Sequence, residues 1–233
     1  KQAGIHDFVI VEKADDVGGT WRDNTYPGAA CDVPSHLYCY SFEPNPDWSR
    51  SYAPQEEIQD YIRRCVDKYN LRPHIRFNTE IVSARYNEKM ALWEVRDATG
   101  MMARVHIVIS AKGALQIPSL PAIPGIDTFR GDAFHSAQWR HDVDLTGKEV
   151  AVIGTGASAI QIVPAIAGQV KKLNLFQRTP PWVMPKMDRD YLGIEKFLFK
   201  RFPRLNRLHR NSLYWMFESR ALGFVVDPRL MKL

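Results

Sequence analysis

The chain lacks the features that mark several classes of protein. No apolar run is long enough to span a bilayer, so no transmembrane helix is expected. The three cysteines form no CxxC or CxxxxC pair, which argues against a disulfide oxidoreductase and against a structural zinc site. No metal is therefore expected. The widely spaced thiols of Cys31, Cys39 and Cys65 are instead typical of a reducing cytoplasm.

Charge is unevenly distributed along a chain of otherwise average composition. Hydrophobic residues make up 45% of the 233 residues, and this length allows one large or two small domains. Residues 186–233 contain eleven Lys or Arg against five Asp or Glu, a net charge of +6. The whole chain carries +5, so the rest carries −1. No nucleic-acid-binding motif accompanies the basic segment, so no nucleic-acid partner is expected.

The clearest local motif is a glycine turn between a strand and a helix. Residues 149–153 end in an apolar run of the kind buried in a parallel sheet, and residues 157–167 have a helical pattern. Pro164 is expected to end or kink that helix early. Between strand and helix lies the GxGxxA pattern formed by Gly154, Thr155, Gly156, Ala157, Ser158 and Ala159. Such a turn lets the backbone and the helix N-terminus approach a pyrophosphate, which predicts dinucleotide binding.

A second predicted strand, residues 173–176, indicates which dinucleotide is bound. The strand leads into Arg178, twenty-four residues after Gly154, with Thr179 beside it. An acidic residue at this point would bind a ribose 2′-hydroxyl, whereas an arginine accommodates a 2′-phosphate. The pattern therefore favours NADP over NAD. The alternative is that Arg178 is an ordinary cation at a strand end.

The N-terminal residues predict a second dinucleotide unit. Residues 7–11 form a buried-type strand that ends in Glu12, the acid expected for a ribose with a free 2′-hydroxyl, such as the adenosine of FAD. The glycine loop that should lie about 20 residues earlier has no room after Lys1. We therefore expect this chain to lack the first strand and phosphate loop of an FAD unit.

An FxGxxxHxxxW pattern precedes the glycine turn and ends fifteen residues before it. It is formed by Phe129, Gly131, His135 and Trp139. With the turn, it resembles the fingerprint of the Baeyer–Villiger monooxygenases, flavoenzymes that use FAD, NADPH and oxygen to insert an oxygen atom beside a ketone. The family usually continues with Pro or Asp, where this chain has Arg140. The resemblance implies that the His and Trp couple NADP binding to domain movement; the alternative is a structural histidine.

Residues 17–21 and 26–32 resemble family segments that wrap the flavin and the nicotinamide. The resemblance implies FAD contacts from Glu12, Gly19, Thr20, Trp21, Asp32, Tyr38 and Ile81. It implies NADP contacts from Ala30, Cys31 and Asp32, besides those of the glycine turn, Arg178 and Thr179. Asp32 is the one catalytic candidate, because the family aspartate lies beside the flavin and tunes an arginine, here expected beyond residue 233. The alternative for residues 17–21 is a surface loop with Trp21 as a core anchor.

Other segments give coarser expectations. A helix is expected after Ala53, with an apolar face formed by Ile58, Tyr61, Ile62, Cys65, Val66 and Tyr69. Strands are expected at residues 81–86, 92–96 and 104–110, with a hairpin turn at residues 97–100. Residues 192–202 and 205–222 combine cations with aromatic residues and leucines. Membrane-surface contact through residues 192–222 is one interpretation, and a helical insertion that packs on a core is the favoured one.

The sequence thus predicts an α/β, two-dinucleotide-binding-domain flavoprotein that is truncated at both ends. Residues 1–125 are expected to form the FAD domain, residues 126–185 the start of the NADP domain, and residues 186–233 a basic helical segment. The resemblance implies conversion of a ketone and O2 to an ester or lactone. The alternatives are a flavin-containing monooxygenase that oxidises nitrogen or sulfur, and a non-catalytic module that holds NADP. Expressed alone, the chain is expected to be inactive and to hold FAD poorly.

Overall fold

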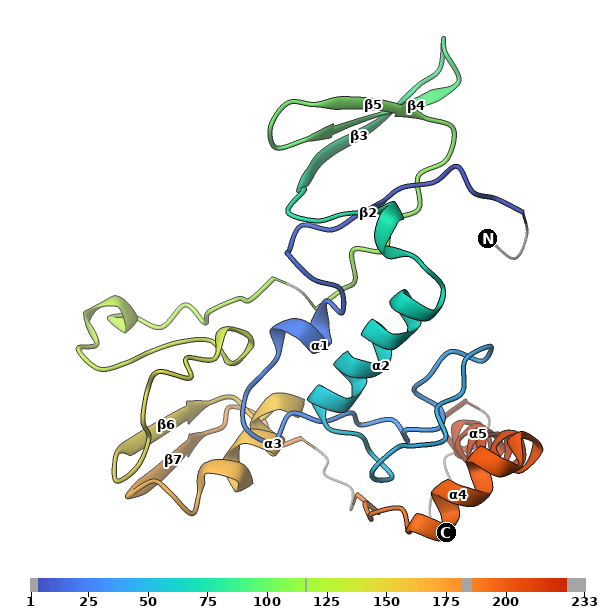
Figure 1. The fold of residues 1–233 in the computed structure, drawn as a ribbon. Coiled ribbons are helices and arrows are strands. Elements are labelled where there is room, and N and C mark those ends of the chain that lie inside the picture. Colours follow the sequence, from blue (N-terminus) through green and yellow to red (C-terminus); the bar gives the residue numbers. More distant parts are fainter. Residues whose placement is uncertain (1–3, 116, 182–185, 226–233) are drawn as a thin grey trace. The chain divides into compact units, whose positions relative to one another are not determined.

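The computed structural model describes residues 4–115, 117–181 and 186–225, without the side chains of residues 220–224 (Figure 1). Residues 182–185 and 226–233, which belong to the predicted NADP domain and basic segment, lie outside the described residues. The chain divides into two compact units. Unit 1 comprises residues 1–23 and 59–138, and unit 2 comprises residues 24–58 and 139–233. The predicted functional domain boundaries stay predictions.

The first strand of unit 1 is shorter than expected. β1 covers Ile10–Val11 and pairs in parallel with β2, Ile75–Arg76, which follows the 3-10 helix η1, Arg72–His74. The ladder continues by one bond, from the Glu12 N–H to the Arg76 carbonyl at 3.0 Å. The expectation of a strand over residues 7–11 is therefore wrong at its start. A strand extends only as far as its neighbour pairs with it, and β2 has two residues.

A three-stranded antiparallel sheet forms the other part of unit 1. It has the order β3-β4-β5, with β3 at Ile81–Asn87, β4 at Leu92–Asp97 and β5 at Met102–Val105. The turn after β4 is the predicted hairpin: the Asp97 carboxylate accepts the Met101 N–H at 2.9 Å, and Gly100 has a φ of 90°. The strand expected at 104–110 is wrong beyond Val105. Val105 pairs with Trp93, so β4 supplies almost no further partner.

Helix α2, Gln55–Lys68, confirms the helix expected after Ala53. Its buried apolar side chains are Ile58, Tyr61 and Cys65, spaced three and four residues apart on one helix face, and Val66 beside Cys65. Gln55 and Gln59 are also buried. Glu56 and Glu57 in its first turn complement the positive end of the helix dipole. The apolar face inferred from the sequence is therefore the buried one, while Ile62 and Tyr69 are half-buried.

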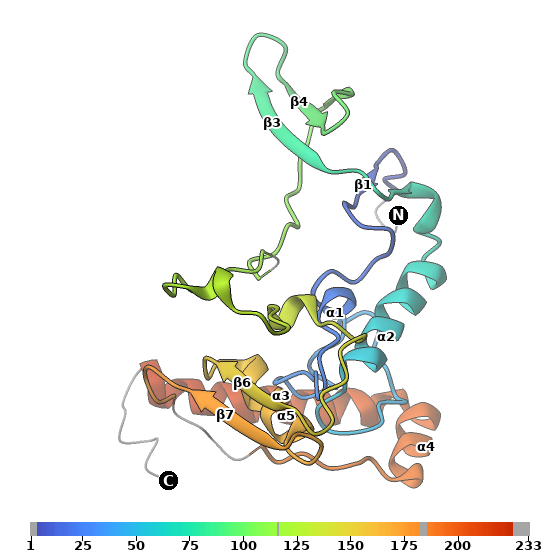
Figure 2. The ribbon, with the colours of Figure 1, turned by 90° about the vertical axis from the view of Figure 1, so that its left-hand side faces the viewer.

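Unit 2 contains a parallel β-α-β unit. β6, Glu149–Ile153, and β7, Lys172–Phe176, pair in register from Glu149 with Lys172 to Ile153 with Phe176. They are joined by α3, Ala157–Ile166, which lies against the two strands in both views (Figures 1 and 2). Pro164 does not end the helix early, because the Ala167 N–H still bonds to the Val163 carbonyl at 3.1 Å. Ile162 and Ile166 are buried.

Two helices follow in unit 2, α4 at Gly193–Arg201 and α5 at Pro203–Val225. They confirm the helical character expected for this basic segment. Phe199 packs with His36 and Tyr191 in a core that also contains Trp48, and His36 is 1% exposed. Within the described part of the chain, no helix combines the length and apolarity needed to cross a bilayer.

Candidate functional site

The glycine turn of unit 2 leaves open space at the end of β6. Gly154 has a φ of 106°, a conformation that favours glycine, and its N–H bonds to the Phe176 carbonyl at 2.9 Å. Among the described residues, apart from each glycine and its two chain neighbours, no heavy atom lies within 4 Å of a Cβ built on Gly154 or Gly156. Residues 157–159 form the first turn of α3, where backbone N–H groups point away from the helix. The turn therefore has the shape and polarity of an anion cradle.

Arg178 and Thr179 lie at the same edge of this sheet. Both follow β7 directly and both are exposed. Because β6 and β7 are parallel, their carboxyl ends lie side by side, and the bond between Gly154 and Phe176 ties them together. The glycine turn and the exposed residue Arg178 thus follow neighbouring strands at one edge, and their binding of NADP stays a prediction.

Residues 26–32, here called the clamp segment, lie against α3. Gly28 has a φ of 80°, and a Cβ built there would lie 2.7 Å from the Gln161 carbonyl oxygen. The Gln161 side chain donates to the Ala30 carbonyl at 2.8 Å and to Asp32 Oδ1 at 3.1 Å. It accepts the Tyr26 hydroxyl at 3.0 Å. Residues 30–32 are therefore attached to the helix that starts at the glycine turn.

The Asp32 carboxylate faces a cation as well as an amide. Lys186 Nζ lies 3.5 Å from Asp32 Oδ1 and donates to the Cys31 carbonyl at 2.9 Å. The same ammonium group lies over the Tyr52 ring, 4.7 Å from its centroid. The Asp32 side chain is 61% exposed, so this charge is presented at the surface of unit 2.

Cys31 has a structural role in the clamp segment, and its thiol is not reactive. Its side chain is 4% exposed, and its N–H bonds to the Ala53 carbonyl at 2.9 Å. Burial raises the pKa of the Cys31 thiol, so the thiol stays protonated at neutral pH. In the described residues, no group of three or more His, Cys, Asp or Glu side chains could hold a metal ion.

The other residues predicted to contact FAD are mostly in unit 1. Glu12 follows β1, and its Oε1 accepts the Ala14 N–H at 2.9 Å and lies 3.2 Å from Arg22. Gly19 has a φ of 50° and precedes α1, Thr20–Asp23, which contains Thr20 and Trp21. Trp21 is half-buried in this short helix, which does not fit the alternative of a surface loop with Trp21 as a core anchor. Ile81 begins β3, whereas Tyr38 belongs to unit 2.

The fingerprint residues flank two short helices, η2 at Ile126–Thr128 and η3 at Ser136–Gln138. His135 Nδ1 accepts the Ala137 N–H at 3.1 Å, which fixes the ring at the start of η3. A Cβ on Gly131 would lie 2.7 Å from the Phe129 ring, which is 64% exposed. The boundary between the units falls between Gln138 and Trp139, inside the fingerprint.

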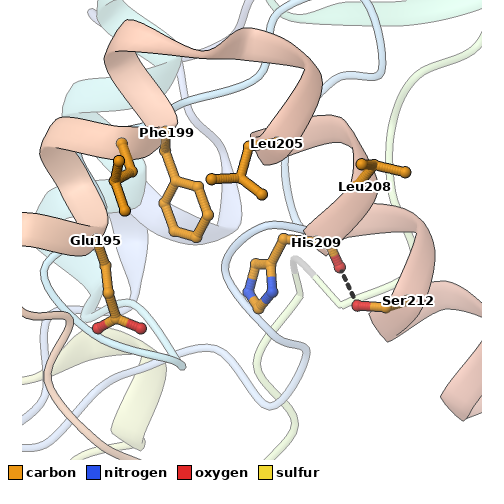
Figure 3. Close-up of a pocket in the computed structure, with 7 residues that line it drawn as sticks. Glu195, Phe199, Leu205, Leu208, His209 and Ser212 are labelled. Atoms are coloured by element: carbon orange, nitrogen blue, oxygen red, sulfur yellow. Dashed lines mark hydrogen bonds between the residues drawn. The ribbon is translucent and has the colours of Figure 1, made fainter.

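A separate pocket of about 420 Å³ lies between α4 and α5 (Figure 3). Its lining is mainly apolar, with Phe199 and His209 stacked 5.2 Å apart. The Glu195 carboxylate is bound by both terminal nitrogens of Arg189, which with the Leu192 N–H holds the pKa of Glu195 at about 2. An ionised, paired carboxylate is a poor general acid or base. The pocket contains no residue that the sequence singled out, and we assign it no role in the chemistry.

Gln161 and Lys186 were missed by sequence reasoning. Gln161 did leave a signal, because it is the one long polar side chain in the apolar helix formed by residues 157–166. It also lies four residues after Ala157, on the same face as the start of the helix. Lys186 left none, since it is one cation among many in a basic segment.

Replacing Gly28 with alanine is expected to destabilise unit 2. A left-handed conformation costs a residue with a Cβ about 1–2 kcal/mol, and the new methyl group would also press on the Gln161 carbonyl. Gly147→Ala is the matched control, because Gly147 has a φ of 69° and open space around its Cβ position. Urea unfolding should show a larger loss for Gly28→Ala than for Gly147→Ala. Equal losses would show that the close approach to α3 is unimportant.

Comparison with known proteins supports a common family. The family model described as flavin-binding monooxygenase-like matches residues 5–223. A Baeyer-Villiger monooxygenase of Pseudomonas aeruginosa is 50% identical over all of this chain and 44% of the relative. One of Streptomyces coelicolor is 49% identical over 98% of this chain and 44% of the relative. The chain thus spans less than half the length of these curated relatives.

Solved structures show the same likeness. The ε-caprolactone-bound crystal structure of cyclohexanone monooxygenase in the Loose conformation aligns with a TM-score of 0.77 and 39% identity. The alignment covers 83% of this chain and 39% of that one. The structure of OTEMO in complex with FAD and NADP has a TM-score of 0.79 and 37% identity, covering 94% and 41%. The predicted α/β fold class and the resemblance to Baeyer–Villiger monooxygenases are confirmed, and this chain belongs to the flavin-binding monooxygenase-like family.

Proposed function

We propose that the protein encoded by the reading frame of this chain is a flavin-dependent monooxygenase. It would use NADPH and O2 to convert a ketone to an ester or lactone. One observation carries the proposal: the open glycine turn shares a sheet edge with exposed Arg178, in a chain that is 50% identical to a Baeyer-Villiger monooxygenase. A similar solved structure, named as a cyclohexanone monooxygenase, holds ε-caprolactone, which is a lactone.

NADP fits the edge formed by β6 and β7. The space over Gly154 and Gly156 would admit a pyrophosphate, and the N-terminus of α3 would donate N–H groups to it. Arg178 would bind the 2′-phosphate, with Thr179 as a neighbouring hydroxyl donor. The nicotinamide end would be approached by Ala30, Cys31 and Asp32, because the Gln161 side chain of the same helix donates hydrogen bonds to Ala30 and Asp32.

The residues proposed to bind FAD are, one by one, those that the family resemblance implies. Glu12 lies at a strand end, where its carboxylate would accept a ribose hydroxyl. Oε1 of this carboxylate accepts the Ala14 N–H and lies near Arg22. Gly19, Thr20 and Trp21 would line the flavin side, and Ile81 would flank the adenine. The proposed domains are residues 1–125 for FAD and residues 126–185 for the start of the NADP domain.

Bound FAD and NADPH supply the redox chemistry and the activation of oxygen, and the protein supplies binding, orientation and charge. Asp32 presents a fixed negative charge on the clamp segment, held by Gln161 and Lys186. In a water-poor site such a charge would strengthen and orient a nearby cation. His135 and Trp139 would couple NADP binding to domain movement, the role that the family resemblance implies.

Asp32→Ala is expected to slow flavin reduction or ketone turnover by roughly tenfold or more, the scale of one lost electrostatic contact in an active site. Folding should be little affected, because the Asp32 side chain is 61% exposed. Stopped-flow reduction by NADPH and steady-state turnover would measure the effect. Asp144→Ala, which also removes an exposed carboxylate from unit 2, is the control. Parent-level turnover in Asp32→Ala would remove the catalytic role from Asp32.

Two other functions were left open by the sequence. A flavin-containing monooxygenase would oxidise nitrogen or sulfur, and a non-catalytic module would hold NADP without flavin chemistry. The names of the relatives favour ketone oxidation. Product analysis with a ketone and with a thioether separates these functions: ester formation supports the proposal, whereas sulfoxide as the sole product, or neither product, would overturn it.

Location and membrane contact are proposed from the cysteines and from the last two helices. All three cysteines are free thiols, which supports a reducing compartment such as the cytoplasm. Helices α4 and α5 expose large apolar side chains, including Phe197 at 59% and Trp215 at 69%. Such residues among cations would suit an anionic lipid surface, although amphipathic helices more often pack on protein. Co-sedimentation with anionic vesicles would decide between these two roles.

A further inference from the structure

We propose that Gln161 is a positioning residue that sets the orientation of the Asp32 carboxylate. The inference rests on the proposed function, in which Asp32 acts beside the bound cofactors. Gln161 Nε2 donates to the Ala30 carbonyl at 2.8 Å and to Asp32 Oδ1 at 3.1 Å. Its Oε1 accepts the Tyr26 hydroxyl at 3.0 Å and the Ala30 N–H at 3.3 Å. One side chain thus contacts both ends of the clamp segment.

The hydrogen-bonding capacity of this amide is fully used. A glutamine side chain has two N–H donors and an oxygen with two lone pairs, and each of the four has a partner here. The pattern also fixes which end of the amide faces Asp32, because Tyr26 and the Ala30 N–H need an acceptor. No other residue type offers both sets at this length. A carboxylate would lose the donors and repel Asp32, and an apolar side chain would lose all four bonds.

The clamp segment is held from a second side by backbone bonds. The Cys31 N–H bonds to the Ala53 carbonyl, and the Gln55 N–H bonds to the Ala29 carbonyl, each at 2.9 Å. Gly28 allows the segment to approach α3 closely. These contacts fix the path of the backbone, but none of them reaches the Asp32 side chain. Gln161 is therefore the neutral contact that directs the carboxylate, and Lys186 is the charged one.

Without Gln161, the carboxylate should turn towards the lysine. Lys186 Nζ is 3.5 Å from Asp32 Oδ1 and is already attached to the Cys31 carbonyl. Loss of the amide would leave this attraction unopposed, so Asp32 would change its rotamer while the backbone bonds kept the segment folded. A variant without Gln161 should therefore fold, but its Asp32 carboxylate should have a different orientation.

The position of Gln161 also links Asp32 to the glycine turn. Gln161 is five residues after Gly156 in the same ten-residue helix. A helix of this length moves as one body, so a phosphate bound at its N-terminus and a carboxylate held on its side keep a constant separation. Through Gln161, α3 would therefore fix the distance between the NADP phosphates and Asp32.

A double-mutant cycle on the protein encoded by the full reading frame tests the inference. The variants are Gln161→Met, Asp32→Ala and the pair, with Gln169→Met as the control because Gln169 is exposed beyond the end of α3. Anaerobic stopped-flow measures flavin reduction by NADPH. We expect about a tenfold slowing in Gln161→Met and no further slowing when it is added to Asp32→Ala. Multiplying effects would overturn the inference, because they would show that Gln161 does not act through Asp32.

Hydrogen–deuterium exchange on this chain tests the contact separately from the activity. Gln161→Met should raise exchange of the Ala30 amide at least several-fold, because this N–H loses its acceptor, while the Cys31 amide, which bonds to the Ala53 carbonyl, stays at the parent level. Gln169→Met should leave both amides at the parent level. Unchanged exchange in Gln161→Met would overturn the inference whatever the kinetics show. If the parent protein failed to reduce flavin, the proposed function and the kinetic part of the inference would fall together, and the exchange result would still decide whether Gln161 holds the segment.

Discussion

Replacing Arg178 with alanine is expected to weaken NADPH binding by about 10- to 100-fold and to leave NADH binding nearly unchanged. A charge-assisted hydrogen bond to a phosphate contributes roughly 1.5–3 kcal/mol, and NADH has no 2′-phosphate to lose. Arg178 is exposed at the end of β7, so its removal should not disturb the packing of the sheet. Titration of both cofactors against the parent and the variant would measure the two losses.

The control for this prediction is Arg207→Ala. Arg207 is an exposed cation of α5 in the same unit, so this variant removes the same charge from another place. It should leave the preference for NADPH over NADH unchanged. Equal losses for the two cofactors in Arg178→Ala would contradict the role of Arg178, and similar losses in Arg207→Ala would indicate a general effect of charge.

The chain is expected to lose stability as the pH falls from about 7 to about 4, and His36 is the main cause. Burial, with the nearby His209 and Arg210, lowers the pKa of His36 from 6.5 to about 4. The unfolded state therefore binds the proton more tightly, so the stability present above pH 6.5 is lost as the pH falls towards 4. The difference in pKa corresponds to about 3 kcal/mol. Burial also lowers the pKa of His209, which acts in the same direction.

Urea unfolding of the parent and of His36→Phe across this pH range would check the assignment. Phenylalanine keeps an aromatic ring against Phe199 and Tyr191, which lie 4.9 and 5.1 Å from the His36 ring. We expect a much shallower pH dependence in His36→Phe, and the parent dependence in His106→Gln, which changes an exposed histidine. The same slope in the parent and His36→Phe would contradict this account.

The β6-α3-β7 unit could be predicted from the sequence because its signals are local. An apolar run, two glycines and a helical pattern follow one another within residues 149–166, and each restricts the backbone where it stands. The helix α2 was predictable for the same reason. Pro164 was misjudged because it lies close to the end of α3, where a proline removes one bond and the next turn still forms.

The clamp segment could not be predicted, because its contacts join distant parts of the chain. Gln161 bonds to residues more than 125 positions away, at sequence separations of 129 and 131. No periodicity reports such a pairing. The end of β5 was predicted wrongly for a related reason. Residues 106–110 are apolar enough for a strand, but the pairing of β5 with β4 ends at Val105. The length of a strand depends on the segment that pairs with it, whereas a sequence pattern describes only the strand itself.

The origin of the oxygen atom in the product tests the central claim most directly. The protein encoded by the full reading frame would be purified, its flavin spectrum recorded, and NADPH and a series of cyclic ketones supplied under oxygen-18 gas. In the proposed reaction one atom of O2 enters the product and the other leaves as water, while NADPH is oxidised to NADP⁺. The account predicts a yellow protein and a lactone with one heavy atom, in its ring oxygen. Unchanged ketone, or a lactone without the label, would contradict it.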